Sequence, residues 1–376
     1  MDLELSPDQQ FFVETTRRFL EAETPVASVR AREGDPAPFD RDWWRQGAEL
    51  GWTSMLVPED LGGGSLSGDG LLDLVLVAEE MGRVVAPGAL TPVNVVADTL
   101  ARSGSPDHHA LLPSIVAGDT IATWAFLEPA RAWDVARLEL SATPDGDEFV
   151  LDGTKVLVES GAIADLFLVT TATDGNPTQF LVPAAAAGLS VEDEDGIDLA
   201  RRHSTVVFSA VRVPRSAVVG EVGGAADDVA RQLQVAVVLQ VAETCGVMTR
   251  VLDFTIEYLG DRYSFGRPLS SYQALKHRVA DMKMWVEASL GVAGAAARAV
   301  QHDDPEAEAI VRAAASYVGE RATDLVQDCV QLHGGIGVTW EHDLHLYLRR
   351  ATVNRFTYGT PDEHRESLAA LELAED

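Results

Sequence analysis

Residues 261–282 read DRYSFGRPLSSYQALKHRVADM, and this stretch divides two long helical segments. Apolar residues recur at helical spacing both before it and after it, and again in residues 305–333. That third segment runs into QLHGGIGVTWEHDLHLYLRRA, residues 331–351. The helical segments are long, mixed in face and rich in alanine, which favours close packing in a four-helix bundle.

The spacing of apolar residues is different in the part of the chain that precedes these helical segments. Between residues 119 and 222, β-branched residues alternate in short runs such as EFVLDGTKVLVES and STVVFSAVRVP, separated by Gly, Pro and Asp-Gly turns. In the first part of the chain, up to about residue 118, apolar residues again recur at helical spacing. We therefore predict an α+β fold with an N-terminal helical domain (1–118), a middle antiparallel β-domain of barrel or sandwich type (119–222) and a C-terminal helical bundle (223–376).

Composition excludes several classes of partner. The formal net charge is −30, so the surface repels nucleic-acid phosphates and anionic lipid heads. An anionic small molecule binds only where a few Arg and Lys residues locally outweigh this field. No apolar run approaches the roughly 20 residues of a membrane span, and the acidic start MDLELSPDQQFF does not resemble a secretory signal. We expect a cytoplasmic protein that binds neither membrane nor nucleic acid.

Three local features have simple interpretations. Cys245 and Cys329 lie in apolar helical contexts, which predicts buried thiols rather than a disulfide. The loop GGGSLSG follows no strand and lacks the Lys of a phosphate-binding loop, so we interpret it as a helix connector. His342 and His345 in WEHDLHLY share a helix face and suggest a metal site, but the sequence offers no third ligand.

Together, residues 261–282 and 331–351 resemble the two signatures of the acyl-CoA dehydrogenase family. The three-part order agrees, as do VPEDLGG at 57–63 and the Glu-Pro pair of FLEPARAWD at 126–134. Members bind FAD between the β-domain and the bundle and remove two hydrogens across the α,β carbons of an acyl-CoA thioester. The resemblance implies FAD as cofactor, an acyl-CoA substrate, an electron-transfer flavoprotein as acceptor, and an oligomer in which the adenosine end of FAD reaches a neighbouring subunit.

The resemblance also assigns the flavin contacts across a subunit interface. An Arg guanidinium forks onto a pyrophosphate, and Gly residues let backbone N–H groups approach it. The implied contacts are Arg262, Ser264, Phe265, Gln273, Gln331, Gly334, Gly335, Gly337 and Thr360.

The catalytic base departs from the family pattern. Many members carry a glutamate directly before the Gly-Thr of the C-terminal turn, where this chain has Tyr358, and a phenol with a pKa of about 10 is a poor base at pH 7. Other members carry the glutamate on the helix that precedes residues 261–282, at a position that aligns with Ala236. The Tyr358 backbone N–H would still polarise a thioester oxygen.

Glu243 is the remaining candidate base. It follows Ala236 by about two helical turns on the same face, and its neighbours are apolar, which predicts a raised pKa. The alternative is that Glu243 pairs with a buried Arg or belongs to a polar network. A displaced base fits a bacterial subgroup that acts on bulky, branched or ring-bearing acyl groups, including steroid-derived ones.

The flavin pocket departs as well. Members place a Trp and a Thr beside the flavin ring on a β-domain strand, where this chain has Leu157 and Glu159. The Gly-rich, Ser-containing stretch after Glu-Pro is replaced by Arg131, Trp133 and Asp134. A negative Glu159 would disfavour an anionic reduced flavin.

Three hypotheses follow. The first is an FAD-dependent acyl-CoA dehydrogenase, homodimeric or homotetrameric, with Glu243 as base. The second is a catalytically silent subunit of an α2β2 heterotetramer, which lends Arg262, Phe265 and Gln273 to the flavin of a sister chain. The third keeps the fold and uses the flavin as an oxidase or monooxygenase.

Overall fold

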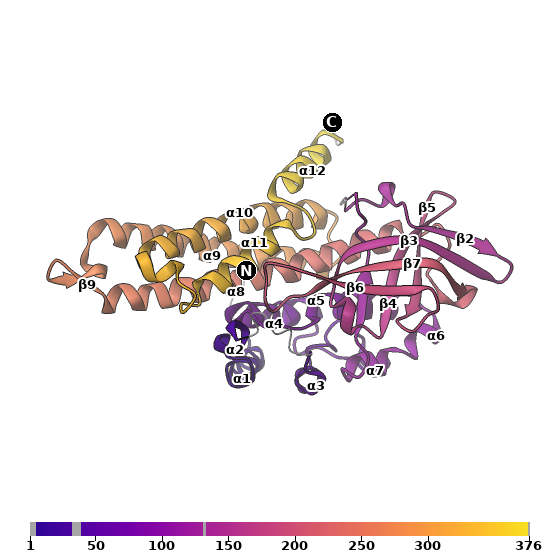
Figure 1. Ribbon diagram of the computed structural model, residues 1–376, viewed down its shortest axis with the longest axis horizontal. Coiled ribbons are helices and arrows are strands. Elements are labelled where there is room, and N and C mark those ends of the chain that lie inside the picture. The colour runs from indigo at the N-terminus through magenta and orange to yellow at the C-terminus, as the bar shows by residue number, and fades with distance from the viewer. Residues whose placement is uncertain (1–4, 32–38, 131–132, 375–376) are drawn as a thin grey trace.

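The computed structural model describes residues 5–31, 39–130 and 133–374. The molecule is elongated, with a β-domain at one end and long helices that extend to the other (Figure 1). The N-terminal helices pack along one side of these long helices. The order of helices, strands and helices confirms the predicted α+β class.

The N-terminal helices are α1 (Pro7–Glu23), α2 (Val26–Arg30), α3 (Arg41–Glu49), α4 (Gly70–Val84), α5 (Leu90–Arg102), α6 (Pro106–His109) and α7 (Leu112–Val116). A capping box begins α1, because the Ser6 hydroxyl accepts from the Gln9 N–H and the Gln9 side chain accepts from the Ser6 N–H. α5 is buried along most of its length and contacts both α8 and β1. It therefore links the N-terminal helices to the β-domain and the bundle.

The β-domain contains β1 (Ala122–Ala125), β2 (Ser141–Asp145), β3 (Glu148–Glu159), β4 (Leu166–Thr173), β5 (Asn176–Pro183), β6 (Leu189–Glu194), β7 (His203–Pro214) and β8 (Val218–Val219). They form one sheet in the order β6-β7-β3-β2-β4-β5-β8, with β1 paired to β4. Most pairs are antiparallel, as predicted, but β1 and β2 each meet β4 in parallel. One face packs a core of its own around Phe149, Phe167, Phe180 and Phe208.

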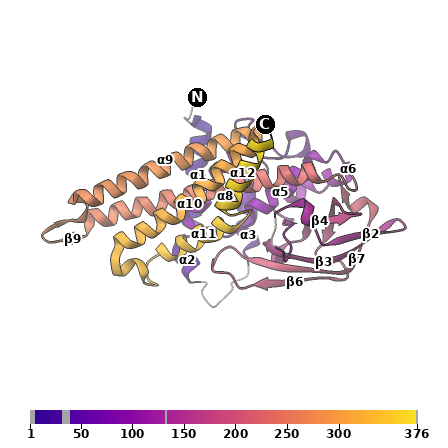
Figure 2. The ribbon, with the colours of Figure 1, turned by 90° about the horizontal axis from the view of Figure 1, so that it is seen from above.

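The C-terminal region consists of α8 (Ala226–Asp261), the hairpin β9 (Tyr263–Ser264) and β10 (Arg267–Pro268), α9 (Gln273–Gln301), α10 (Ala307–His333), the short turn η6 (Gly334–Val338), α11 (Leu344–Phe356) and α12 (Pro361–Ala374). α8 runs through the middle of the bundle and contacts α4, α9, α10 and α11 (Figures 1 and 2). By length and composition α8 would be able to cross a membrane, but 89% of its most apolar window is buried inside the protein. It is therefore the core helix of the bundle.

Two glycines let α4 and α8 pack in backbone contact. A Cβ added at Gly82 on α4 would lie 1.9 Å from the Glu243 carbonyl oxygen on α8. A Cβ added at Gly246 on α8 would lie 1.9 Å from the Glu79 carbonyl oxygen on α4. This reciprocal contact fixes the stretch of α8 that carries Glu243 against the N-terminal helices.

Candidate functional site between the β-domain and the bundle

Tyr358 lies on the turn between α11 and α12, where the bundle meets the β-domain. Its backbone is left-handed (φ 58°) and its side chain is 8% exposed. Its ring packs on Trp133 with centroids 4.9 Å apart, and Trp133 stacks on Phe126 at 5.7 Å with planes 8° apart. The hollow left beside Leu157 and Glu159 measures about 20 Å³, which is room for about one water molecule. The three aromatic rings therefore fill this part of the domain boundary.

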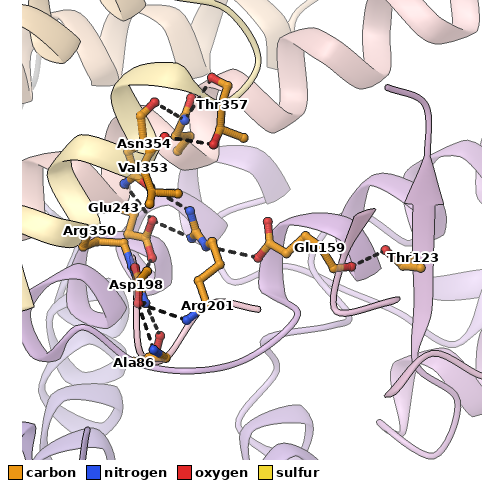
Figure 3. Close-up of polar contacts among 12 residues, drawn as sticks. Ala86, Thr123, Glu159, Asp198, Arg201, Glu243, Arg350, Val353, Asn354 and Thr357 are labelled. Atoms are coloured by element: carbon orange, nitrogen blue, oxygen red, sulfur yellow. Dashed lines mark hydrogen bonds and ion pairs between the residues drawn. The ribbon is translucent and has the colours of Figure 1, made fainter. Parts of the chain in front are cut away.

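Glu159 points into the same boundary from the end of β3. Leu157 is the extra residue of a β-bulge, with φ at 50°, and this bulge sets the direction of the strand end. The Glu159 carboxylate is buried, with Oε1 3.3 Å from Nε of Arg201 (Figure 3). Its Oε2 has no hydrogen-bond partner among the described residues. Burial raises the pKa of Glu159 although Arg201 opposes this shift.

Three side chains donate hydrogen bonds to the carboxylate of Glu243 (Figure 3). Its Oε2 accepts from Nη2 of Arg201 at 2.7 Å and from Nδ2 of Asn354 at 3.0 Å, and its Oε1 accepts from Nη1 of Arg350 at 2.6 Å. Burial by itself would raise the pKa of Glu243, but the two guanidinium groups hold it below its ordinary value. The predicted raised pKa is therefore wrong, because the helix neighbours used for that prediction are not the groups that contact the carboxylate.

Asp198 completes the group, which we call the ion cluster: Asp198, Arg201, Glu243, Arg350 and Asn354. Arg350 is fully buried and donates to Asp198, to Glu243 and to the carbonyl oxygen of Ala86. The cluster joins the loop before β7, α8 and α11. A buried Arg partner is the alternative expected for Glu243, but no local pattern in the sequence marks Arg201, Arg350 or Asp198 as its neighbours.

The assigned flavin contacts, with the exception of Thr360, lie far from this boundary. The hairpin that carries Arg262, Ser264 and Phe265 projects from the end of the bundle opposite the β-domain (Figure 1). Phe265 is 97% exposed, with φ at 51°. Gln273 is also exposed at the start of α9. These four residues therefore cannot contact a ring held beside Tyr358 of the same chain.

The second signature is at this end of the bundle too. Gln331, Gly334 and Gly335 are exposed where α10 passes into η6, and Gly337 is buried. We call the hairpin and η6 together the bundle end. Thr360 lies apart from it, near Tyr358, where its N–H donates to Oε2 of Glu363 at 2.7 Å and helps to cap α12.

The two histidines considered as metal ligands are engaged otherwise. The His345 ring stacks on Trp340 at 4.3 Å, and His342 accepts from the Leu344 N–H at 3.2 Å. Across the described residues, no group of three or more His, Cys, Asp and Glu side chains would hold a metal ion. Cys245 and Cys329 are free and buried, as predicted, and burial raises the pKa of both thiols.

Family models match three consecutive parts of the chain. They describe the N-terminal domain (residues 6–119), the middle domain (123–211) and the C-terminal domain (227–372) of acyl-CoA dehydrogenases. Together with the helix, sheet and bundle order, these matches define the class, and the chain belongs to the acyl-CoA dehydrogenase family. Members are FAD-dependent enzymes, so the family and its cofactor are confirmed as predicted.

Among its relatives is "Acyl-CoA dehydrogenase IpdE2" of Mycolicibacterium smegmatis, 30% identical over 98% of this chain and 99% of that protein. The protein of the same name in Mycobacterium tuberculosis is 32% identical over 97% of this chain and 96% of its own length. Among solved structures, butyryl-CoA dehydrogenase from Megasphaera elsdenii matches 99% of this chain and 100% of its own, with a TM-score of 0.91 and 25% identity.

The residues of this boundary do not fit a flavin ring. In the family pattern the ring lies beside the strand positions held here by Leu157 and Glu159. The indole of Trp133 takes up the space in front of them and leaves a hollow of about 20 Å³. The buried Oε2 of Glu159 would also face the ring with a carboxyl group. Of the departures noted in the stretch after Glu-Pro, Arg131 lies outside the described residues, and Asp134 caps the short turn η2 (Val135–Arg137).

Proposed function

We propose that this chain is a subunit of an FAD-dependent acyl-CoA dehydrogenase in which its own flavin-ring site is closed. It contributes by completing the flavin site of a sister chain with its bundle end. The observation that carries this proposal is the position of Trp133, which stacks on Phe126, packs against Tyr358 and lies beside Leu157 and Glu159, where the family resemblance expects the flavin ring.

The groups near Tyr358 are poorly suited to act as a catalytic base, which supports a chain that does not convert substrate by itself. A base needs a carboxylate with a free lone pair and access to substrate. Glu243 does not meet this need, because Arg201, Arg350 and Asn354 donate to both of its oxygens and its side chain is buried. The phenol of Tyr358 is buried and burial raises its pKa further above the physiological range. A chain active alone, with Glu243 as base, would require both Trp133 and the ion cluster to rearrange.

The exposed side chains of the bundle end support its proposed contact with a sister chain. Phe265 and Val338 expose 97% and 75% of their surfaces, and large exposed apolar side chains are typical of protein interfaces. Arg262 and Arg267 lie beside them, in a chain with a net charge of −30. We propose that Arg262, Ser264, Phe265 and Gln273 contact the pyrophosphate and adenosine end of a sister chain's FAD.

Four more of the assigned contacts belong to the other loop of the bundle end. We propose that Gln331, Gly334, Gly335 and Gly337 take the same cofactor, because glycines allow close approach of backbone N–H groups. An acyl-CoA thioester as substrate of the assembly follows from the family. A bulky acyl group, an electron-transfer flavoprotein as acceptor and a cytoplasmic location stay predictions, since a closed pocket carries no information on any of them.

The test is to purify the chain alone and together with the sister chain encoded by its own organism. Alone, it should be colourless and inactive toward acyl-CoA thioesters, and the assembly should be yellow and active. Arg262→Ala and Phe265→Ala should lower the activity and flavin content of the assembly. Lys283→Ala, which removes an exposed ion pair with Glu287 on α9, should change neither. Turnover by the isolated chain would overturn the proposal.

A further inference from the structure

The hairpin of the bundle end turns through a loop of two residues, Phe265 and Gly266. Ser264 and Arg267 pair on either side of this loop, and its two residues have positive φ, 51° and 80°. Positive φ at both positions is typical of the type I′ turn of tight hairpins, which favours Asn followed by Gly. A bulky aromatic residue rarely adopts this conformation, so the turn at Phe265 needs support from the residues around it.

Tyr272 supplies this support from outside the hairpin. Its hydroxyl donates to the carbonyl oxygen of Ser264 on β9 at 2.8 Å. Its ring lies beneath the guanidinium group of Arg267 on β10, with 3.8 Å between the guanidinium carbon and the ring centroid, which is the geometry of a cation–π contact. One side chain therefore contacts both strands, and we call Tyr272 with its contacts to Ser264 and Arg267 the tyrosine clamp.

The tyrosine clamp also connects the hairpin to α9. The carbonyl oxygen of Tyr272 accepts from the Lys276 N–H at 3.0 Å in the first turn of that helix, and Gln273 is its first residue. The same residue thus holds the hairpin and begins the helix. As a result, the clamp fixes the positions of Arg262, Phe265 and Gln273 relative to one another.

The tyrosine clamp lies away from the core of the protein. Arg267 is exposed and Tyr272 is half-buried, and the hairpin projects beyond the ends of the long helices (Figures 1 and 2). Within the part of the chain that the structure describes, Tyr272 is not a member of either hydrophobic core. Removing the clamp should therefore loosen the hairpin and leave the rest of the fold intact.

We propose that Tyr272 and Arg267 are positioning residues for the FAD of the sister chain. This inference rests on the proposed function of the bundle end. The clamp holds the hairpin in its binding conformation before the cofactor arrives, so that binding requires little further ordering of the chain. Arg267 acts through its stack on Tyr272 and not as a ligand of the cofactor phosphates.

Amide hydrogen exchange in the isolated chain tests the clamp itself. The Leu269 N–H donates to the Arg262 carbonyl oxygen at 2.8 Å across the base of the hairpin. Tyr272→Ala should speed exchange of this amide by a factor on the order of ten without changing the urea midpoint. Tyr263→Ala changes a tyrosine of the same hairpin that is 63% exposed and outside the clamp, and it should leave the exchange unaltered. Equal exchange in Tyr272→Ala and the unchanged chain would overturn the clamp, whatever the role of the bundle end.

FAD titration of the assembly with the sister chain tests the positioning role. Tyr272→Ala should weaken FAD binding by a factor on the order of ten. The loss should appear in the FAD concentration that gives half-maximal activity and not in kcat, because the proposed contacts of the hairpin are with the pyrophosphate and adenosine end. Tyr272→Phe keeps the ring beneath Arg267 and should recover part of the affinity. Arg267→Lys keeps the charge but lacks the planar group that stacks on the ring, so it should also weaken binding.

A double variant separates positioning from direct contact with the cofactor. Tyr272→Ala combined with Arg267→Ala should lose no more affinity than Tyr272→Ala alone, because both changes break the same clamp. Additive losses, or full affinity in Arg267→Lys, would mean that Arg267 binds the cofactor directly and would overturn the inference. An unchanged flavin content in Arg262→Ala would instead refute the proposed function, and with it the positioning role, while hydrogen exchange would still report on the clamp.

Discussion

The indole of Trp133 lies 4.9 Å from the ring of Tyr358, centroid to centroid, and this contact closes the boundary between the β-domain and the bundle. Tyr358 stands where many family members carry a glutamate, and Trp133 belongs to the stretch that replaces a Gly-rich, Ser-containing one after Glu-Pro. Under the proposed function, this pair of side chains fills the space of a cofactor ring and leaves the usual position of the base without a carboxylate.

Reopening this boundary should restore an affinity for flavin. The double change Trp133→Ser and Glu159→Thr removes the indole and the buried carboxyl group, and it should cost about 1–3 kcal/mol of stability. FAD titration followed by flavin fluorescence should then show binding that the unchanged chain lacks. Trp285→Ser, a change to a Trp on α9 beside Arg321, is the control. Failure of the double variant to bind FAD would mean that other residues close the site.

The ion cluster should make Glu243 important for stability. Glu243→Gln leaves Arg201 and Arg350 short of a negative partner in the interior, and breaking such a buried pair costs about 3–5 kcal/mol. Urea unfolding measures this loss. Arg312 and Glu308 form an exposed pair, so Glu308→Gln should cost no more than about 1 kcal/mol. Similar losses for the two variants would contradict the structural role of the cluster.

Helix packing predicts opposite effects for glycines on the same helix. Gly246→Ala places a methyl group against the backbone of α4 and should destabilise the fold by about 1–3 kcal/mol or more. Gly260 also lies on α8, but a Cβ there meets no neighbouring atom. Gly260→Ala should instead stabilise by about 0.5–1 kcal/mol. Chemical denaturation of both variants checks the sign, and a neutral Gly246→Ala would rule out the backbone contact.

Two histidines should make the fold sensitive to mild acid. Burial, with nearby Arg201 and Arg312 respectively, lowers the pKa of His203 and of His364 to about 4, against about 6.5 in an unfolded chain. Between these values the unfolded chain binds more protons, so stability falls as pH drops from about 6.5 toward 4. The double variant His203→Gln and His364→Gln should flatten the urea midpoint over this range. An unchanged pH slope would show that neither group is buried in its neutral form.

The bundle end should control assembly. Phe265→Asp places a charge on the most exposed large apolar side chain among the described residues, where an interface would desolvate it. Light scattering after gel filtration should show a smaller species. Leu373→Asp changes another exposed residue, 76% exposed near the end of α12, and should leave the mass unchanged. An unaltered mass for Phe265→Asp would exclude the hairpin from the interface.

Much of the fold follows from local sequence patterns. The spacing of apolar residues predicted the long helices and the alternating strands, because each pattern repeats along one element. The ion cluster has no such pattern. Arg201 and Arg350 reach Glu243 across 42 and 107 residues of sequence, so the local neighbours of Glu243 suggested an apolar setting and a raised pKa. Likewise, the sequence displayed the change at Trp133 without revealing that its ring stacks on Phe126.

The most direct test of the account is the number of flavins per chain in the purified assembly. If this chain closes its own ring site and completes that of a sister, the assembly should hold one FAD for every two chains, and the isolated chain should hold none. One FAD per chain, or a stoichiometric flavin in this chain purified alone, would contradict the account.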